Sequence, residues 1–304
     1  MAFLELTLAL TAAQQPRAEA MLEELGALSI TLLDADAETP DERAIFEPGV
    51  GETPLWKALV LNALFESDAD HGAIVSALRE ALPELSPEQI HFREVADQDW
   101  ERAWMDRFQP MRFGRRLWIY PWNLEPPAND QESVVVRLDP GLAFGTGTHP
   151  TTALCLEWLD GLPLRNRTVL DFGCGSGVLA IAALKLGAAK AIGVDNDPQA
   201  LTASLDNAQR NDVSDRLALY TPGDLPALQC DVLIANILAG PLHDLAPVFA
   251  SLVKPGAAFA LSGILAGQEQ ELLQRYAATG FTDLKVVPRE DWMRINGRSP
   301  LIAA

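Results

Sequence analysis

The pattern of apolar and polar residues divides the chain into two parts of different character. In the first hundred residues, Leu4, Leu6 and Leu8 alternate with Phe3, Glu5 and Thr7, as in a strand with one buried face. From Gln14 to Leu25 the apolar residues recur every three or four positions, which predicts a helix. Similar patterns predict strands at 29–33 and 89–95 and a helix at 70–82. The segment 56–66 suits either a helix or a strand; as a strand it would complete the β-α-β-β-α-β order of a ferredoxin-like fold.

We therefore predict a small α+β domain over residues 1–95. An aromatic stripe follows it: Trp100, Trp104 and Phe108 recur at four-residue spacing, behind Asp97, which can cap a helix. These rings could form a platform for a substrate, but the spacing favours a connecting helix that packs them against a domain. We assign residues 96–115 to a linker helix and loop, and residues 116–304 to a second domain.

The second domain alternates strand-like and helical segments. Strands are expected at 168–171, 191–195, 217–220, 232–235, 257–261 and 285–287, and helices at 179–186, 199–209, 242–252 and 268–278. Such alternation predicts a mostly parallel sheet with helices on both faces. Ligands of these sheets bind beyond the carboxyl ends of the strands. The expected fold is α/β, with a small α+β domain before a Rossmann-like sheet.

Charge and composition narrow the class of protein. The 304 residues carry a formal net charge of −19, and residues 1–99 hold 20 acidic but only 5 basic side chains. Nucleic-acid-binding proteins normally present a basic face, so direct binding of DNA or RNA is not expected. No apolar run approaches the roughly 20 residues that span a bilayer, and no secretory signal is visible. We expect a cytoplasmic protein, and a monomer because no long exposed apolar helix stands out.

The three cysteines, Cys155, Cys174 and Cys230, are widely spaced and lie in apolar segments. They match neither a disulfide framework nor a zinc pattern. The sequence predicts no metal site.

The strongest local signal is the segment Val169–Gly177, which reads VLDFGCGSG. An apolar strand runs into a turn with three glycines and then into a helix. Glycines allow positive φ and let a ligand approach the backbone, and the helix begins with unpaired N–H groups. Dinucleotide-binding enzymes use a similar turn with the spacing Gly-x-Gly-x-x-Gly, whereas Asp-x-Gly-x-Gly-x-Gly stands here. We interpret Gly173 and Gly175 as cofactor-binding residues.

Two polar residues end the neighbouring strands. Asp195 closes one of them, where a carboxylate can accept hydrogen bonds from the two hydroxyls of a ribose. Asp197, directly before Pro198, is expected to cap a helix instead. Asn236 closes the run DVLIAN, beside the glycine turn across the sheet. Its carboxamide can hold an amine near a cofactor, so we predict a catalytic role for Asn236, with a local loop contact as the alternative.

A polar loop precedes the glycine-rich strand. Residues 138–152 contain three glycines, several hydroxyls and a histidine, and they could fold over a ligand, with Thr152 supplying a hydroxyl. His149 is a candidate base, but its place before Pro150 favours a capping or packing role. No Ser-His-Asp set, HExxH or Walker sequence accompanies it, so the sequence does not support a hydrolase or a phosphotransferase.

Together, Asp171–Gly177, Asp195 and Asn236 resemble the class I methyltransferases that use S-adenosylmethionine. Within that class, the loop Asp139–Thr152 and the segment Asn236–Leu242, which reads NILAGPL, are similar to the bacterial family that methylates ribosomal protein L11. The resemblance extends over nearly the whole chain and is more specific in the second domain than in the first.

The resemblance implies a protein methyltransferase that uses S-adenosylmethionine and trimethylates lysine side chains and the N-terminal amine of ribosomal protein L11. It implies that the first domain holds the substrate and that Thr152, Gly173, Asp195 and Asn236 contact the cofactor. Many amine methyltransferases read Asn-Pro-Pro-Tyr at the fourth strand; this chain has Asn-Ile-Leu-Ala there and lacks the aromatic wall. A methyltransferase of another protein, an RNA or a small molecule, and a nucleotide-dependent oxidoreductase, are the alternatives.

Overall fold

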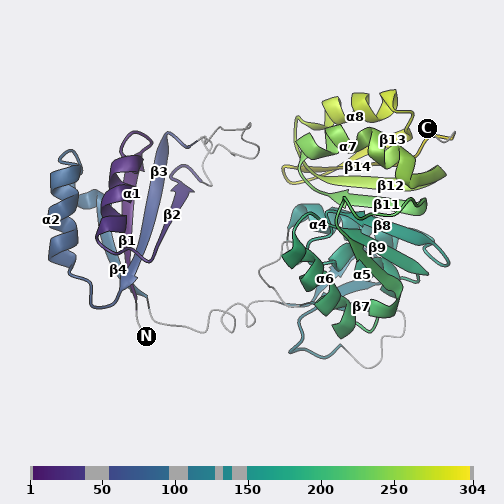
Figure 1. Cartoon of the computed structure of the whole chain (residues 1–304), viewed down its shortest axis with the longest axis horizontal. Helices are drawn as coiled ribbons and strands as arrows, with labels where there is room; N and C mark the ends of the chain where they lie inside the picture. The colour runs from purple at the N-terminus through teal and green to yellow at the C-terminus, as the bar shows by residue number, and fades with distance from the viewer. Residues whose placement is uncertain (1–2, 38–54, 96–108, 127–132, 139–148, 302–304) are drawn as a thin grey trace. The chain divides into compact units, whose positions relative to one another are not determined.

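The computed structural model describes residues 3–37, 55–95, 109–126, 133–138 and 149–301. The chain forms two compact units, Met1–Trp100 and Glu101–Ala304 (Figure 1). The expected linker helix with Trp100, Trp104 and Phe108 lies outside the described residues, as do residues 139–148 of the polar loop. In the described part of the chain, no helix is both long and apolar enough to cross a membrane.

The first unit is a four-stranded antiparallel sheet with two helices. Its elements are β1 (Phe3–Thr11), α1 (Gln15–Glu24), β2 (Ser29–Asp34), β3 (Ala58–Glu66), α2 (His71–Ala81), the 3₁₀ turn η1 (Pro87–Gln89) and β4 (Ile90–Val95). The strand order β2-β3-β1-β4 is that of a ferredoxin-like fold, as predicted. The segment 56–66, which suited either a helix or a strand, contains the strand β3. Every second residue of this strand, Leu59, Leu61, Ala63 and Phe65, faces the core between the sheet and the helices.

The second unit contains a seven-stranded sheet, a three-stranded sheet and five α-helices among its described residues. The small sheet consists of β5 (Met111–Phe113), β6 (Leu117–Tyr120) and β7 (Val134–Arg137). The helices are α4 (Pro150–Asp160), α5 (Val178–Lys185), α6 (Pro198–Arg210), α7 (Ala239–Leu252) and α8 (Glu269–Ala278), with the 3₁₀ turn η2 (Ser214–Arg216). The large sheet consists of β8 (Thr168–Phe172), β9 (Lys190–Val194), β10 (Leu217–Tyr220), β11 (Cys230–Asn236), β12 (Val253–Leu265), β13 (Thr282–Arg289) and β14 (Trp292–Arg298).

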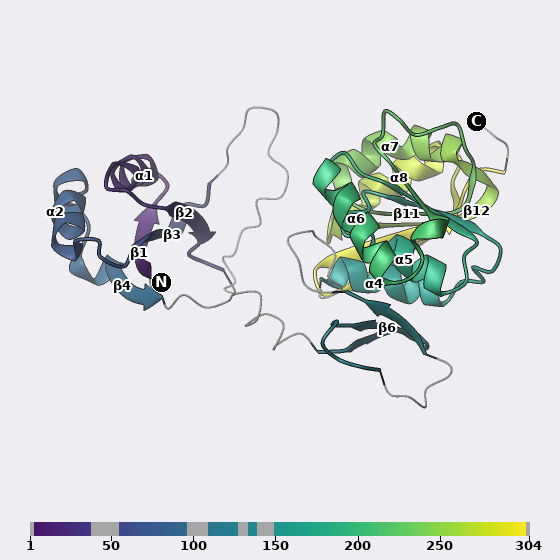
Figure 2. The same ribbon diagram turned by 60° about the horizontal axis from the view of Figure 1, so that its bottom comes forward.

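The large sheet has the order β10-β9-β8-β11-β12-β14-β13. Only β14 runs opposite in direction to the other six strands, so it is antiparallel to both β12 and β13. Side chains of its central strands alternate between two cores, as the two-residue period of a strand requires. Val169 and Ile234 point to the core with α4 and α5, whereas Leu170 and Leu233 point to the core with α7 and α8. Figures 1 and 2 show these two helical layers on opposite faces of the sheet.

Two features of the second unit differ from the expectation. The sequence shows no clear signal for β14, which pairs with β12 and places an antiparallel strand inside the sheet. The small sheet is also additional, and its strand β5 lies within the stretch that we assigned to the linker. Phe113, Leu117 and Ile119 of this sheet pack into the core that α4 and α5 share. A three-residue strand such as β5 carries too little periodicity to be recognised in the sequence.

Candidate active site

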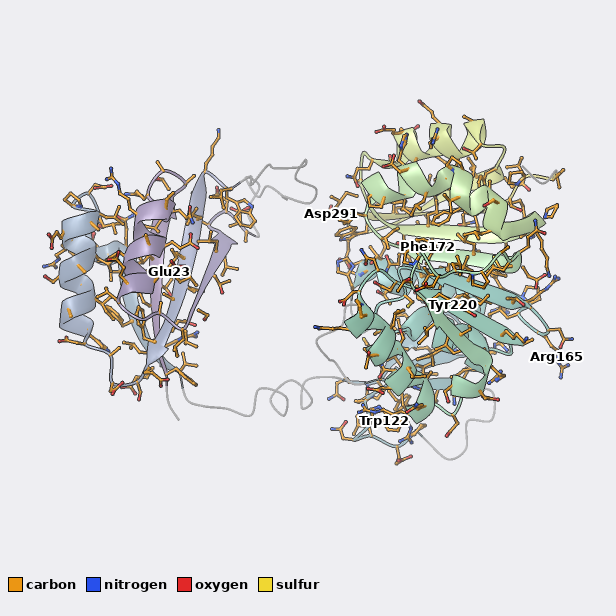
Figure 3. All side chains as sticks on the ribbon, viewed as in Figure 1. Glu23, Trp122, Arg165, Phe172, Tyr220 and Asp291 are labelled. Carbon is orange, nitrogen blue, oxygen red and sulfur yellow. The ribbon has the colours of Figure 1, made fainter. Side chains whose placement is uncertain are left out.

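The predicted site residues gather at one edge of the large sheet. The strands β8, β9, β11 and β12 are parallel, so their carboxyl ends, at Phe172, Val194 and Asn236 among others, lie at the same edge. Asp291, in the turn between β13 and β14, lies on this side of the sheet, and Arg165, before β8, lies at the opposite edge (Figure 3).

The glycine turn connects β8 to α5 and is held by the neighbouring strand. The N–H groups of Gly173 and Cys174 donate to the carbonyl of Val194 at 2.7 and 3.0 Å. Gly173 and Gly175 have φ of +78° and +52°, a region that favours glycine. A Cβ on Gly173 would also overlap the side chain of Ile237, so the turn and the segment after β11 pack without space for one. The close packing of this turn against Ile237 therefore requires glycine at position 173.

Two side chains of α6 fix the remaining carbonyls of this turn. The hydroxyl of Ser204 donates to the carbonyl of Gly175 at 2.8 Å, and the carboxamide of Asn207 donates to that of Ser176 at 2.9 Å. Neither residue was recognised in the sequence. The only signal available there is the presence of small polar residues on a helix otherwise predicted to be amphipathic.

Asp195 lies directly beside the glycine turn. One carboxylate oxygen accepts the N–H of Gly175 at 2.9 Å, and the other accepts the N–H of Asp197 at 3.0 Å. Each oxygen retains a further acceptor position, so the carboxylate is fixed in place and can still bind a pair of hydroxyls. Asp197 accepts the N–H of Gln199 at 2.8 Å and caps α6, as predicted.

Asn236 and Thr152 meet at the end of β11 although they are 84 residues apart in the chain. The amide nitrogen Nδ2 of Asn236 donates to the hydroxyl oxygen of Thr152 at 3.3 Å. The other end of the amide, Oδ1, is buried and has no hydrogen-bond donor among the residues that the structure describes. A buried acceptor without a donor is destabilising by about 1–3 kcal/mol, and it is typical of a site that a ligand completes.

His149 has the capping role that its position before Pro150 favours. Its Nδ1 lies 2.7 Å from the hydroxyl oxygen of Thr151 and accepts the N–H of that residue at 3.3 Å, at the N-terminus of α4. Its ring packs edge-on against Trp292 at 4.8 Å between centroids. Partial burial lowers the pKa of His149, while Glu290 opposes this shift. The imidazole is therefore neutral near pH 7, and its Nδ1 accepts the hydrogen bond that caps α4.

Asp171 is a further residue of this edge for which the sequence showed no role. It lies at the end of β8, is completely buried, and accepts the N–H of Ala180 at 3.0 Å, which ties the first turns of α5 to the strand. Burial raises the pKa of this carboxyl to about 7; the N–H of Ala180 opposes the shift and the charge of Asp195 adds to it. A carboxyl between Leu170 and Phe172 on a central strand was the available signal.

Because its pKa is raised in the folded state, Asp171 contributes stability that is complete below about pH 4 and is lost as the pH rises to about 7. The variant Asp171→Asn cannot ionise and keeps an acceptor for Ala180. We expect its melting temperature, relative to that of the unchanged protein, to rise by about 5–10 °C between pH 5 and pH 8. Thermal unfolding followed by circular dichroism measures this difference. A difference that does not change with pH would show that Asp171 is ionised in the fold throughout this range.

The strand order with its antiparallel β14, the glycine turn, and the acid at the end of the next strand define this second unit as a class I methyltransferase. A sequence profile described as "Ribosomal protein L11 methyltransferase (PrmA)" matches residues 2–300. The chain belongs to this family.

Relatives from several bacteria are similar over the full chain. The ribosomal protein L11 methyltransferase of Stenotrophomonas maltophilia strain K279a is 59% identical over 303 residues, covering 98% of this chain and 99% of that protein. The protein of the same name from Pseudomonas paraeruginosa is 55% identical over 300 residues, with the same coverage. Among solved structures, the ribosomal protein L11 methylase of Lactobacillus delbrueckii subsp. bulgaricus is 32% identical with a TM-score of 0.58, covering 63% of this chain and 100% of that one.

Proposed function

We propose that this chain transfers methyl groups from S-adenosylmethionine to ribosomal protein L11, trimethylating lysine side chains and the N-terminal amine, in the cytoplasm. Membership in the family and the names of the full-length relatives support this choice of substrate. The observation that carries the chemistry is the buried Oδ1 of Asn236 at the end of β11, an acceptor to which no residue in the described ranges donates. A neutral amine has the N–H group that this oxygen lacks.

The residues at the edge of the sheet suit the proposed cofactor. Asp195 would bind the ribose hydroxyls, and the backbone of Gly173 and Gly175 would lie against the cofactor, because the turn has no side chain there. Thr152 and Asn236, which lie on the other side of the glycine turn from Asp195, would contact the reactive end of the cofactor. When bound, S-adenosylmethionine supplies a methyl group on a positively charged sulfur.

The task of the protein residues is to present an amine in its neutral form and in line with that methyl group. A lysine has a pKa of about 10.4, so deprotonation at pH 7 requires roughly 4.6 kcal/mol. Loss of solvent in the closed site lowers this pKa, as does a positive charge nearby. Asn236 Oδ1 can then orient the amine without taking its proton. We propose that no general base is required and that alignment supplies most of the acceleration.

We propose the first unit as the part that holds the substrate. Residues 1–99 carry 20 acidic against 5 basic side chains, and ribosomal proteins are generally basic. An acidic surface attracts such a partner at long range and raises its association rate. This attraction is screened by salt, so the apparent affinity for the substrate should fall between about 0.05 and 0.3 M salt.

The test of the proposed function is transfer of labelled methyl groups from S-adenosylmethionine by the full chain. Three acceptors are compared: free L11, L11 with its amines chemically acetylated, and ribosomal RNA without protein. Label should enter unmodified L11 only, and repetition of the assay at several salt concentrations measures the electrostatic contribution. Label in RNA alone, or equal label in acetylated and unmodified L11, would show that the chain does not methylate the amines of L11.

A further inference from the structure

The second unit has a hollow at the edge of the large sheet that lies opposite the glycine turn. Its volume is about 300 Å³, the lower end of the range for small-molecule sites. It is lined by Arg167 directly before β8, by residues near the starts of β11 and β12, and by the last residue of β14, so it lies at the amino ends of the parallel strands. The proposed methyl transfer takes place at the other edge and uses none of these residues.

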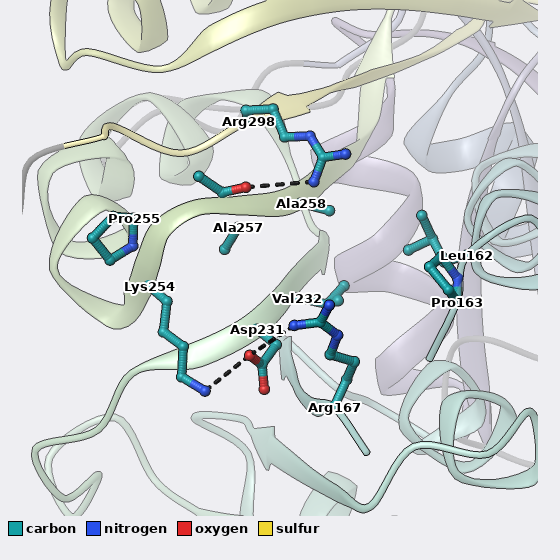
Figure 4. A pocket seen from close by; sticks show the side chains of 11 residues that line it. Leu162, Pro163, Arg167, Asp231, Val232, Lys254, Pro255, Ala257, Ala258 and Arg298 are labelled. Carbon is teal, nitrogen blue, oxygen red and sulfur yellow. Dashed lines mark hydrogen bonds and ion pairs between the residues drawn. The ribbon is translucent and has the colours of Figure 1, made fainter. Parts of the chain in front are cut away.

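Three cationic side chains and one carboxylate face this hollow (Figure 4). Lys254 and Arg167 lie on either side of Asp231: the Nζ of Lys254 is 2.8 Å from Oδ1 of Asp231, and Nη1 of Arg167 is 3.4 Å from the same oxygen. The other oxygen of Asp231 accepts the N–H of Thr168 at 2.9 Å. The carboxylate is therefore anchored to the backbone of β8 and holds two cations at the wall of the hollow.

Arg298 approaches the hollow from β14. Its Nη1 donates to the carbonyl of Gly256 at 3.4 Å, and no carboxylate lies within ion-pair distance of its guanidinium in the described stretches of the chain. An arginine has five N–H donors, of which this contact uses one. The side chains of Arg298, Lys254 and Arg167 are all exposed, so their remaining donors are accessible to a ligand.

The local charge differs in sign from that of the whole protein. Three cations against one carboxylate leave two positive charges around a single small hollow, in a chain whose formal net charge is −19. Like charges at this separation repel one another, and an anion between them removes the repulsion. A phosphate group carries about two negative charges near pH 7 and several acceptor oxygens, which matches this set in charge and in hydrogen bonding.

We propose that this hollow, formed by Arg167, Asp231, Lys254 and Arg298, is a binding site for phosphate groups, separate from the methyl-transfer site. Arg298 and Arg167 present planar donor groups that suit paired phosphate oxygens, and Lys254 adds a compact positive charge. The phosphate could belong to a small free molecule or to the backbone of a nucleic acid. A free phosphate or phosphate monoester carries about two negative charges and a backbone phosphodiester carries one, and both offer anionic oxygens to these residues.

The test titrates inorganic pyrophosphate into the full chain at constant ionic strength, with isothermal calorimetry as the readout. We expect saturable binding with one site, and at least about tenfold weaker binding to the variant Lys254→Gln/Arg298→Gln, which loses two charge-assisted contacts. The matched control is Lys57→Gln/Arg79→Gln, which removes two exposed cations from the first unit and should bind as the unchanged protein does. Melting temperatures verify that both variants are folded, and the single variant Arg298→Gln replaces the double one if that is unstable.

A parallel titration with a short single-stranded RNA identifies the source of the phosphate. If the RNA binds more tightly than pyrophosphate and both lose affinity in the Lys254→Gln/Arg298→Gln variant, the site binds a nucleic-acid backbone. If pyrophosphate binds as tightly or more tightly, the site takes small free phosphates. The proposal is overturned by absence of saturable binding of both ligands up to about 10 mM. It is equally overturned if the control variant loses as much affinity as the variant in the hollow.

Discussion

Replacement of Asn236 by alanine is expected to lower the rate of single-turnover methyl transfer about 100-fold, with the melting temperature nearly unchanged. Nδ2 of Asn236 is held by Thr152 at 3.3 Å, so Oδ1 has a defined direction at the end of β11. Without this acceptor, the amine can rotate out of line with the methyl group, and misplacement by about 1 Å has an effect of roughly this size. Rapid-quench measurement with enzyme in excess over L11 isolates the transfer step from product release.

The variant Asn236→Asp separates orientation from charge. It has nearly the same shape, but its carboxylate stabilises the ammonium form of the target amine and raises its pKa. The rate should therefore be low at pH 7 and recover at higher pH, whereas Asn236→Ala should not recover. The control is Asn166→Gly, an exposed asparagine at the opposite edge with φ of +62°, where glycine is tolerated and activity should not change. An unchanged transfer rate in Asn236→Ala would remove this residue from the mechanism.

Replacement of Gly263 by alanine is expected to have the largest effect on stability. Gly263 lies in β12 with φ of +86°, and a Cβ there would overlap the carbonyl oxygen of Ile237 and lie 2.7 Å from its carbonyl carbon. The obstacle is backbone, so it moves only if the end of β11 moves with it. Strain from the positive φ and the overlap together amount to about 2–5 kcal/mol. We expect the melting temperature to fall by about 5–15 °C.

The same substitution should also reduce activity, because Ile237 directly follows Asn236 and shifts with it. Gly223→Ala is the matched control: no atom lies within 4 Å of its added Cβ, and its φ is not in the positive region. Thermal unfolding and the transfer assay on both variants provide the measurement. A melting temperature of Gly263→Ala within about 2 °C of the unchanged protein would show that the two strand ends adjust without strain.

The elements that the sequence predicted well are apolar runs bounded by glycine, proline or polar residues. The helices α5, α6, α7 and α8 and the strands β8, β9 and β11 were expected close to their observed bounds, because such residues mark where a buried element begins and ends. The strand β3 remained ambiguous until its pairing with β1 and β2 showed which residues face the core. The strand β14 and the small sheet were missed: pairing with β12 places β14 inside the large sheet, and the apolar residues of the small sheet are buried against α4 and α5, which follow later in the chain.

The sequence alone determined the residues at the carboxyl ends of the strands, because a strand followed by a glycine turn, by Asp195 or by Asn236 is a local pattern. Only the tertiary structure decided which of these side chains meet and in which state. Packing of α4 against β11 and β12 brings Thr152 to Asn236, and complete burial raises the pKa of Asp171 to about 7. The cationic hollow likewise exists only after β8, β11, β12 and β14 are paired. Periodicity is encoded within one element, whereas burial and electrostatic environment arise from contacts between elements that lie far apart in the chain.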